Sequence, residues 1–290
     1  MNKRIHLATK HASVLTRLAA SVLVAATFLW TAPAALGQSA ETPFEPVVGQ
    51  EGKDVIWVPT PIALTEKMLD MAKVTSNDFV IDLGSGDGRN VIAAAKRGAR
   101  GLGVEYNPKM VELSRTLAEK EGVADKAQFL QGDMYEADIS QATVMALFLL
   151  PENLRRLTPK FLALKPGSRI VANGFGIDGW EADETGKSTG ECGSWCTAFL
   201  YIVPAQVGGT WKLTSGELML EQKFQMLSGT LTNGGSVTKI TNARLRGDQI
   251  SFTAGNTKYA GRVSGDVMEG RAAGMTSGAW KAIRATHAAH

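Results

Sequence analysis

The sequence predicts an α/β fold with a parallel sheet, followed by a small all-β antiparallel domain. Between about residues 55 and 175, short apolar runs alternate with amphipathic helical patterns, which is typical of a parallel sheet. From Gly208 onward the helical period is lost, and short alternating runs are separated by glycine turns. These patterns place the α/β domain at residues 50–205 and an antiparallel sandwich or small barrel at residues 206–286.

The α/β domain is predicted to begin with a helix through residue 73, with Thr60 as N-cap and Pro61 as the first helical residue. Five strands are then expected at residues 79–83, 101–105, 127–133, 143–150 and 168–175. The connecting helices are expected at residues 89–98, 107–122 and 152–167. Residues 177–196 are expected to form a polar surface segment, and residues 198–204 a further strand.

Residues 1–37 have the pattern of a secretory signal peptide. A basic region up to Arg17 precedes an apolar run at 18–30, and small residues follow, with a plausible cleavage site near Gly37. The apolar run is shorter than the ~20 residues that span a bilayer comfortably. We therefore expect an exported protein, periplasmic or envelope-associated. An uncleaved anchor, which would be its sole membrane contact, and an organelle transit peptide are the alternatives.

The basic character of the chain is concentrated in this leader. The sequence pI is about 8.8, but residues 1–40 contain four cationic side chains and no carboxylate. Without these four, the formal net charge of +3 becomes −1. The body of the protein is therefore near neutral, so we expect no nucleic-acid partner.

The cysteines and histidines limit the possible chemistry. Cys192 and Cys196 are either two buried thiols or a short local disulfide, which an oxidising compartment would favour. No metal site is expected around them. All four histidines lie near the ends of the chain, at positions 6, 11, 287 and 290. This excludes histidine-dependent nucleophilic schemes and histidine-ligated zinc from the body of the protein.

A glycine-rich loop follows the first predicted strand, with glycines at positions 84, 86 and 88. A dinucleotide fingerprint would require its third glycine at the position of Arg89. Asp82 and Asp87 flank the loop, and two carboxylates would repel a pyrophosphate. They suit a cationic ligand such as S-adenosylmethionine (SAM), which carries an ammonium and a sulfonium but no phosphate.

Two more acidic residues follow the next two predicted strands. Glu105 ends the second strand and could accept hydrogen bonds from both ribose hydroxyls. Asp133 ends the third strand and could accept from the adenine amino group, while Met134 packs on the ring. Because parallel sheets bind ligands at the carboxyl ends of their strands, the joint placement of these acids predicts a SAM site.

Five segments carry a resemblance to a known family. They are VPTP (58–61), DLGSGDGR (82–89), GVEYNP (103–108), GDMY (132–135) and FLLP (148–151). Residues 56–180 resemble the class I (seven-strand) SAM-dependent methyltransferases, which have a Rossmann-like sheet. More narrowly, they resemble the small protein-lysine methyltransferases, which include mitochondrial enzymes acting on the ATP-synthase c-subunit and on the adenine nucleotide carrier, and archaeal relatives.

Together, the pattern and the resemblance imply a set of site residues. The expected cofactor contacts are Asp82, Gly84, Ser85, Gly86, Asp87, Gly88, Glu105, Asp133 and Met134. The residues expected near the transferred methyl group are Thr60, Pro61, Pro151 and Asn173. The fourth strand lacks the Asn/Asp-Pro-Pro-aromatic motif, which argues against methylation of DNA bases or glutamine.

The predicted function is in-line methyl transfer to a protein lysine. Such a displacement depends mainly on alignment and desolvation, and a desolvated pocket beside a sulfonium would lower the pKa of the lysine amine. One alternative is a methyltransferase acting on a small molecule or an envelope lipid. Another is a non-catalytic SAM-fold module whose β domain binds a partner. The β domain itself is expected to be a folding appendage or a docking module.

Overall fold

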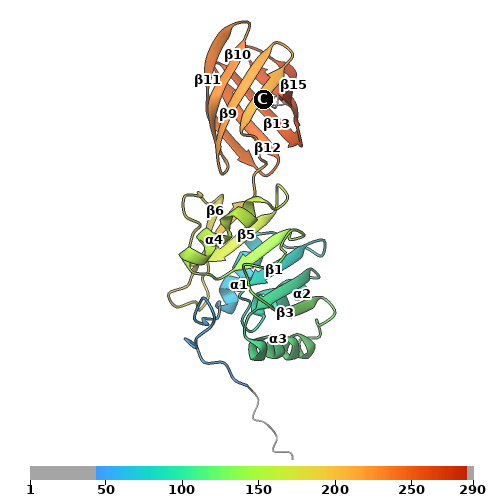
Figure 1. Cartoon of the computed structure of the whole chain (residues 1–290), viewed down its shortest axis with the longest axis vertical. Coiled ribbons are helices and arrows are strands. Elements are labelled where there is room, and N and C mark those ends of the chain that lie inside the picture. The colour runs from blue at the N-terminus through green and yellow to red at the C-terminus, as the bar shows by residue number, and fades with distance from the viewer. Residues whose placement is uncertain (1–43, 286–290) are drawn as a thin grey trace, which may run out of the picture. The chain divides into compact units, whose positions relative to one another are not determined.

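The structure is a computed structural model that describes residues 44–285 (Figure 1). The described part belongs to one compact unit, which begins at Phe44. The predicted signal peptide, residues 1–37, lies outside the described residues. In the part of the chain that the structure describes, no helix is long and apolar enough to cross a membrane.

The α/β domain is built on a seven-stranded sheet in the order β3-β2-β1-β4-β5-β7-β6. Its strands are β1 (Phe79–Leu83), β2 (Arg100–Glu105), β3 (Ala127–Gln131), β4 (Val144–Leu147), β5 (Arg169–Asn173), β6 (Glu184–Lys187) and β7 (Thr197–Ile202). The first five strands are parallel, whereas β7 runs antiparallel to β5 and to β6. The predicted fold class is confirmed.

Helices cover both faces of this sheet because its strands alternate between two apolar cores. The helices are α1 (Ile62–Met71), α2 (Arg89–Lys96), α3 (Pro108–Lys120) and α4 (Pro151–Leu162). In β1, Val80 packs with residues of α1, while Ile81 packs on the opposite face with residues of α4. Helices α2 and α3 share a third cluster with Phe129 of β3. The sheet is therefore the middle of three layers.

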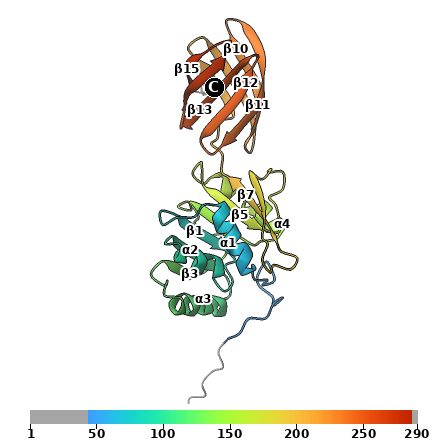
Figure 2. The same ribbon diagram turned by 180° about the vertical axis from the view of Figure 1, so that it is seen from behind.

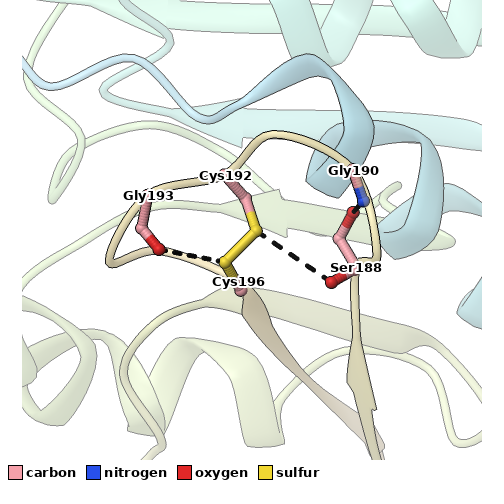
Figure 3. Close-up of a disulfide and its surroundings, with 5 residues drawn as sticks. All are labelled: Ser188, Gly190, Cys192, Gly193 and Cys196. Carbon is pink, nitrogen blue, oxygen red and sulfur yellow. Dashed lines mark hydrogen bonds between the residues drawn. A yellow bond between two sulfur atoms is a disulfide. The ribbon is translucent and has the colours of Figure 1, made fainter.

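Several predicted boundaries were wrong. Helix α1 begins at Ile62 with Pro61 in the N-cap position and no side-chain cap, so Thr60 does not cap it. Helix α4 ends at Leu162, five residues before the predicted end, because the chain turns before Gly167 (φ +91°). The segment 177–196 contains β6 as well as a loop that is closed by a disulfide between Cys192 and Cys196 (Figure 3).

The C-terminal β domain is a closed antiparallel barrel of eight strands (Figure 2). Its strands are β8 (Gly209–Leu213), β9 (Gly216–Lys223), β10 (Met226–Asn233), β11 (Ser236–Arg246), β12 (Gln249–Ala254), β13 (Thr257–Ser264), β14 (Val267–Gly274) and β15 (Gly278–Arg284). Each strand pairs with the next along the chain, and β15 returns to β8. Alternate residues face an interior filled by aromatic side chains that include Trp211 and Phe252.

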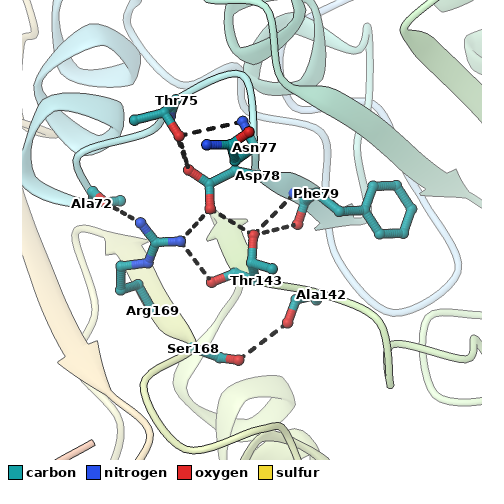
Figure 4. Close-up of polar contacts among 9 residues, drawn as sticks. All are labelled: Ala72, Thr75, Asn77, Asp78, Phe79, Ala142, Thr143, Ser168 and Arg169. Carbon is teal, nitrogen blue, oxygen red and sulfur yellow. Dashed lines mark hydrogen bonds and ion pairs between the residues drawn. The ribbon is translucent and has the colours of Figure 1, made fainter.

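A polar network joins the amino ends of three strands, at the edge of the sheet away from the glycine loop (Figure 4). The buried Asp78 carboxylate accepts hydrogen bonds from Thr75 N–H (2.8 Å) and Thr143 Oγ1 (2.7 Å), and it pairs with Arg169. Burial raises the pKa of Asp78, but these bonds and the Arg169 charge outweigh burial and hold its pKa below the ordinary value. The network fixes β1, β4 and β5 relative to one another.

Candidate active site

The predicted acidic residues meet at the carboxyl edge of the sheet. Asp82 lies in β1, Glu105 ends β2, and Asp133 follows β3, and these three strands are neighbours. Two pockets open at this edge. The larger is lined by Glu105, Asp133 and Met134, and the smaller by Asp82, Ser85, Gly86, Asp87 and Thr60. The chain order reverses between β1 and β4, which is where open α/β sheets bind ligands.

The two pockets share part of their walls. The residues common to both are Trp57, Val58, Gly84 and Phe148. An adenosyl group in the larger pocket and an amino-acid group in the smaller one would therefore join beside these four residues. This arrangement fits SAM, in which the sulfonium links those two groups.

The Glu105 carboxylate is held in a fixed orientation beside the larger pocket. Its Oε2 accepts a hydrogen bond from Gly86 N–H and its Oε1 from Asn107 N–H, both at 2.9 Å. Each carboxylate oxygen can accept more than one hydrogen bond, so both oxygens retain capacity for a further donor. Glu105 is thus suited to accept from two adjacent ribose hydroxyls, as predicted.

Asp82 is the buried acceptor of the smaller pocket. Its Oδ2 accepts from Asn90 Nδ2 (3.0 Å), and Asn90 Oδ1 in turn accepts from Thr65 Oγ1 (2.9 Å). Its Oδ1 is buried and has no hydrogen-bond partner among residues 44–285. Burial raises the pKa of Asp82 well above the ordinary value, and the nearby carboxylates of Glu105 and Asp87 raise it further. Such an orphaned acceptor fits the ammonium group of SAM.

Asp87 and Asp133 differ from Asp82 because each already has a cationic partner. Asp87 forms a two-pronged contact with Arg89, with one pair of atoms at 2.5 Å and the other at 2.9 Å. Asp133 pairs with Lys53, and this bond is the main reason why the Asp133 pKa lies below its ordinary value. The expectation that both loop carboxylates, Asp82 and Asp87, face a cationic ligand stays a prediction. Among Asp82, Asp87 and Asp133, only Asp82 has a carboxylate oxygen with no hydrogen-bond partner among the described residues.

Two of the loop glycines are required by close packing. At Gly86 (φ +56°) a Cβ atom would lie 2.5 Å from the indole nitrogen of Trp57. At Gly88 (φ +81°) it would lie 2.6 Å from ring carbons of Phe129. Gly88 is the N-cap residue of α2 and lines neither pocket, so the structure gives it a role in shaping the loop, and its contact with the cofactor stays a prediction.

The residues predicted near the transferred methyl group are not all brought together. Thr60 is buried and lines the smaller pocket, whereas Asn173 is fully buried behind it and donates weakly to Thr60 Oγ1 at 3.5 Å. Pro61 precedes α1, and Pro151 is the exposed first residue of α4. Neither proline lines either pocket. The structure thus brings Thr60 and Asn173 together beside the smaller pocket and places the two prolines outside both pockets, and the role of all four near the methyl group stays a prediction.

Sequence reasoning missed the N-terminal hairpin, residues 47–57, which forms one wall of the larger pocket. Its strands are joined by hydrogen bonds from Gly49 N–H to Trp57 O (2.8 Å) and from Trp57 N–H to Gln50 O (2.9 Å). Lys53, at its turn, reaches Asp133 and lies over the ring of Tyr106. Its position immediately before the VPTP segment was the available signal.

Known proteins share this architecture and these motifs. The profile of the ANTKMT methyltransferase domain matches residues 82–184. Over 153 residues the chain is 40% identical to a protein-lysine N-methyltransferase of Saccharolobus islandicus (strain REY15A), and the match covers 51% of this chain and 94% of that protein. This chain belongs to that methyltransferase family. The predicted resemblance, the assignment as an enzyme and SAM as its cofactor are confirmed.

Other relatives match a similar part of this methyltransferase. It is 38% identical over 130 residues to the ATP synthase c-subunit lysine N-methyltransferase of Mus musculus, covering 44% of this chain and 51% of the mouse protein. The chain thus spans about half the length of that relative. A crystal structure of an RNA methyltransferase from Salinibacter ruber, in complex with S-adenosyl-L-homocysteine, is 42% identical, covers 52% of this chain and 96% of that one, and has a TM-score of 0.48.

Proposed function

We propose that this methyltransferase N-methylates lysine side chains of a protein substrate. The observation that carries the proposal is the 40% identity to a protein-lysine N-methyltransferase that the chain covers almost completely. The acidic residues of the site support it, because Asp82 and Glu105 lie where an ammonium and a ribose can be held. When bound, SAM supplies the methyl group and leaves as S-adenosylhomocysteine.

The apolar side chains where the two pockets join favour a neutral amine as the methyl acceptor. Val58 and Phe148 form an apolar wall there, and the neighbouring Arg89 is engaged by Asp87 and donates to Thr60 O at 2.7 Å. A lysine amine has a reference pKa of ~10.4, and such a desolvated wall would lower it. The amine loses its proton before it bonds to the methyl carbon, so the protein's task is to align and dehydrate it.

The proposal is tested by incubating the full-length protein with methyl-labelled SAM and a cell-envelope extract. We expect label in protein, released by hydrolysis as methyl-lysine. Label confined to lipid, to small molecules or to RNA would overturn the lysine assignment and name the acceptor class. Glu105→Ala is the matched control, because it should lose cofactor binding and with it all labelling.

We also propose that the enzyme is exported and works outside the cytosol. The composition of residues 1–37 and the disulfide between Cys192 and Cys196 support this, since disulfides persist in oxidising compartments. Fractionation of cells that make the full-length protein tests the proposal. Recovery in the periplasm or envelope, with a shortened N-terminus or a retained anchor, is expected. An intact Met1 and a cytosolic location would refute it.

A further inference from the structure

The short loop between β6 and β7 is closed by a disulfide (Figure 3). Besides the bond between Cys192 and Cys196, Ser188 N–H donates to Cys196 O and Trp195 N–H donates to Cys192 O, both at 2.9 Å. The loop also packs closely against α1, because a Cβ atom at Gly190 would lie 2.6 Å from the Ala63 methyl group. The position of Trp195 is therefore fixed by bonds on both sides of it.

Trp195 completes a group of three aromatic side chains, which we call the aromatic wall: Phe148, Phe175 and Trp195. The Trp195 ring lies edge-on to Phe148 with centroids 5.2 Å apart, and it is tilted against Phe175 at 5.5 Å. All three side chains are half-buried, so each keeps exposed surface. Gly174 (φ +71°) permits this approach, since a Cβ atom there would lie 2.8 Å from Trp195.

The aromatic wall begins at the predicted reaction centre. Phe148 follows β4 and borders both pockets, where the adenosyl and amino-acid groups would join. Phe175 follows β5, the next strand of the sheet. The wall thus leads from the junction of the pockets to the disulfide loop, along the carboxyl edge of the sheet.

We propose that the aromatic wall binds the alkylammonium side chain of the acceptor, and that the disulfide positions Trp195 for this contact. This inference rests on the proposed lysine methylation and adds the residues that recognise the amine. Aromatic faces attract a cation, most strongly for tryptophan. They do so without a full negative charge, so they hold the amine yet oppose its deprotonation less than a carboxylate would.

The first test measures binding of two probes in the presence of S-adenosylhomocysteine. One is Nα-acetyl-trimethyllysine amide, and the other is the uncharged Nα-acetyl-norleucine amide. We expect the wild-type protein to bind the cationic probe more tightly, Trp195→Ala to weaken that binding about tenfold, and Trp195→Phe to weaken it less. Ser194→Ala, an exposed neighbour in the loop, is the control and should bind as wild type.

Equal affinity for the two probes, or an unchanged affinity in Trp195→Ala, would overturn the inference. Affinity for S-adenosylhomocysteine must remain within about twofold in every variant, which shows that the variants are folded. These binding results are independent of methyl transfer. A wild-type protein that prefers the cationic probe but labels no protein lysine would therefore refute the proposed function and leave the cation site in place.

The second test concerns the disulfide. The double variant Cys192→Ser, Cys196→Ser should raise the KM for the protein acceptor and weaken the cationic probe about as much as Trp195→Ala does. Its kcat and its affinity for S-adenosylhomocysteine should stay near the wild-type values. Unchanged binding of the cationic probe in this variant would refute the positioning role of the disulfide.

Discussion

The substitution Asp82→Asn tests the assignment of the buried carboxylate to the ligand ammonium. Asp82 Oδ2 accepts from Asn90, and the unpartnered Oδ1 is the atom assigned to the ligand. An asparagine that keeps the bond to Asn90 would turn its NH₂ group toward the ligand. The variant would then present a donor to a cation, in a side chain of nearly the same shape.

The expected loss follows from the kind of bond that is removed. A hydrogen bond to a charged group contributes about 1.5–3 kcal/mol, so the variant should bind S-adenosylhomocysteine about tenfold to a hundredfold more weakly. This ligand keeps the ammonium and lacks the sulfonium, so the measurement isolates the contact with the amine.

The pH dependence of binding has a definite sign. Because burial raises the pKa of Asp82, a larger fraction of the carboxyl carries a proton in the ligand-free protein than in an exposed aspartate. A cationic ligand favours the ionised form, so binding should release a proton and tighten as pH rises toward that raised pKa. Asp82→Asn should lose this dependence.

The raised pKa of Asp82 also predicts how the stability of the ligand-free protein depends on pH. The pKa of Asp82 is higher in the folded protein than in the unfolded chain, where it is near 3.8. The contribution of Asp82 to the free energy of unfolding is therefore most favourable below pH 3.8. This contribution falls as the pH rises from there to the folded-state pKa. The unfolding free energy of Asp82→Asn, relative to wild type, should therefore improve over that range. Urea denaturation at several pH values measures it.

Calorimetric titration in two buffers of different ionisation enthalpy counts the protons released on binding. A wild-type protein that releases no proton, together with an Asp82→Asn variant of unchanged affinity, would refute the assignment of Asp82 Oδ1 to the ammonium. Asn153→Ala, a buried polar change outside both pockets, serves as a comparison for general effects on folding.

Three further predictions concern the loop, the amino edge of the sheet and the hairpin. Gly88→Ala should lower the unfolding free energy by about 1–3 kcal/mol in urea, because φ is +81° and a ring blocks the new methyl group; an unchanged midpoint would contradict this. Asp78→Asn should lower the unfolding free energy by about 3 kcal/mol at pH 7, because it leaves Arg169 without its carboxylate partner. The pKa of Asp78 is lower in the folded protein than in the unfolded chain, so its contribution to stability is present above the unfolded pKa and is lost as pH falls through the folded pKa. The unfolding free energies of the wild-type protein and Asp78→Asn should therefore converge in acid. Lys53→Ala should free Asp133 and tighten binding of S-adenosylhomocysteine about two- to fivefold by calorimetry; weaker binding would show instead that Lys53 holds the hairpin over the ligand.

The sequence predicted the sheet well because its signals are local. The strand at Phe79–Leu83 was predicted without error, since a short apolar run there is bounded by Asp78 and the glycine loop. The alternating runs after Gly208 predicted antiparallel strands, and the structure closes them into a barrel rather than a sandwich. Closure depends on the pairing of β15 with β8, which lie far apart in the chain, and no local pattern encodes it.

In the candidate site, too, local signals were predicted from the sequence and long-range contacts were not. Asp82, Glu105 and Asp133 were identified from the sequence because each follows or ends a strand, and parallel strands bring such positions to one edge. The sequence did not show that Asp133 is paired with Lys53 from the hairpin. That partner lies 80 residues away, and only the folded chain brings the two charges together.

By itself, the sequence determined the fold class and the cofactor, and it predicted the edge of the sheet at which Asp82, Glu105 and Asp133 lie, because all three depend on short motifs with fixed spacing along strands. The tertiary structure alone decided which carboxylate keeps an open oxygen, since that depends on Lys53 and Arg89. It also decided that Trp195 meets Phe148 across two strands of the sheet. Contacts between residues distant in sequence depend on how the elements pack, and the hydrophobic periodicity of the sequence does not determine that packing.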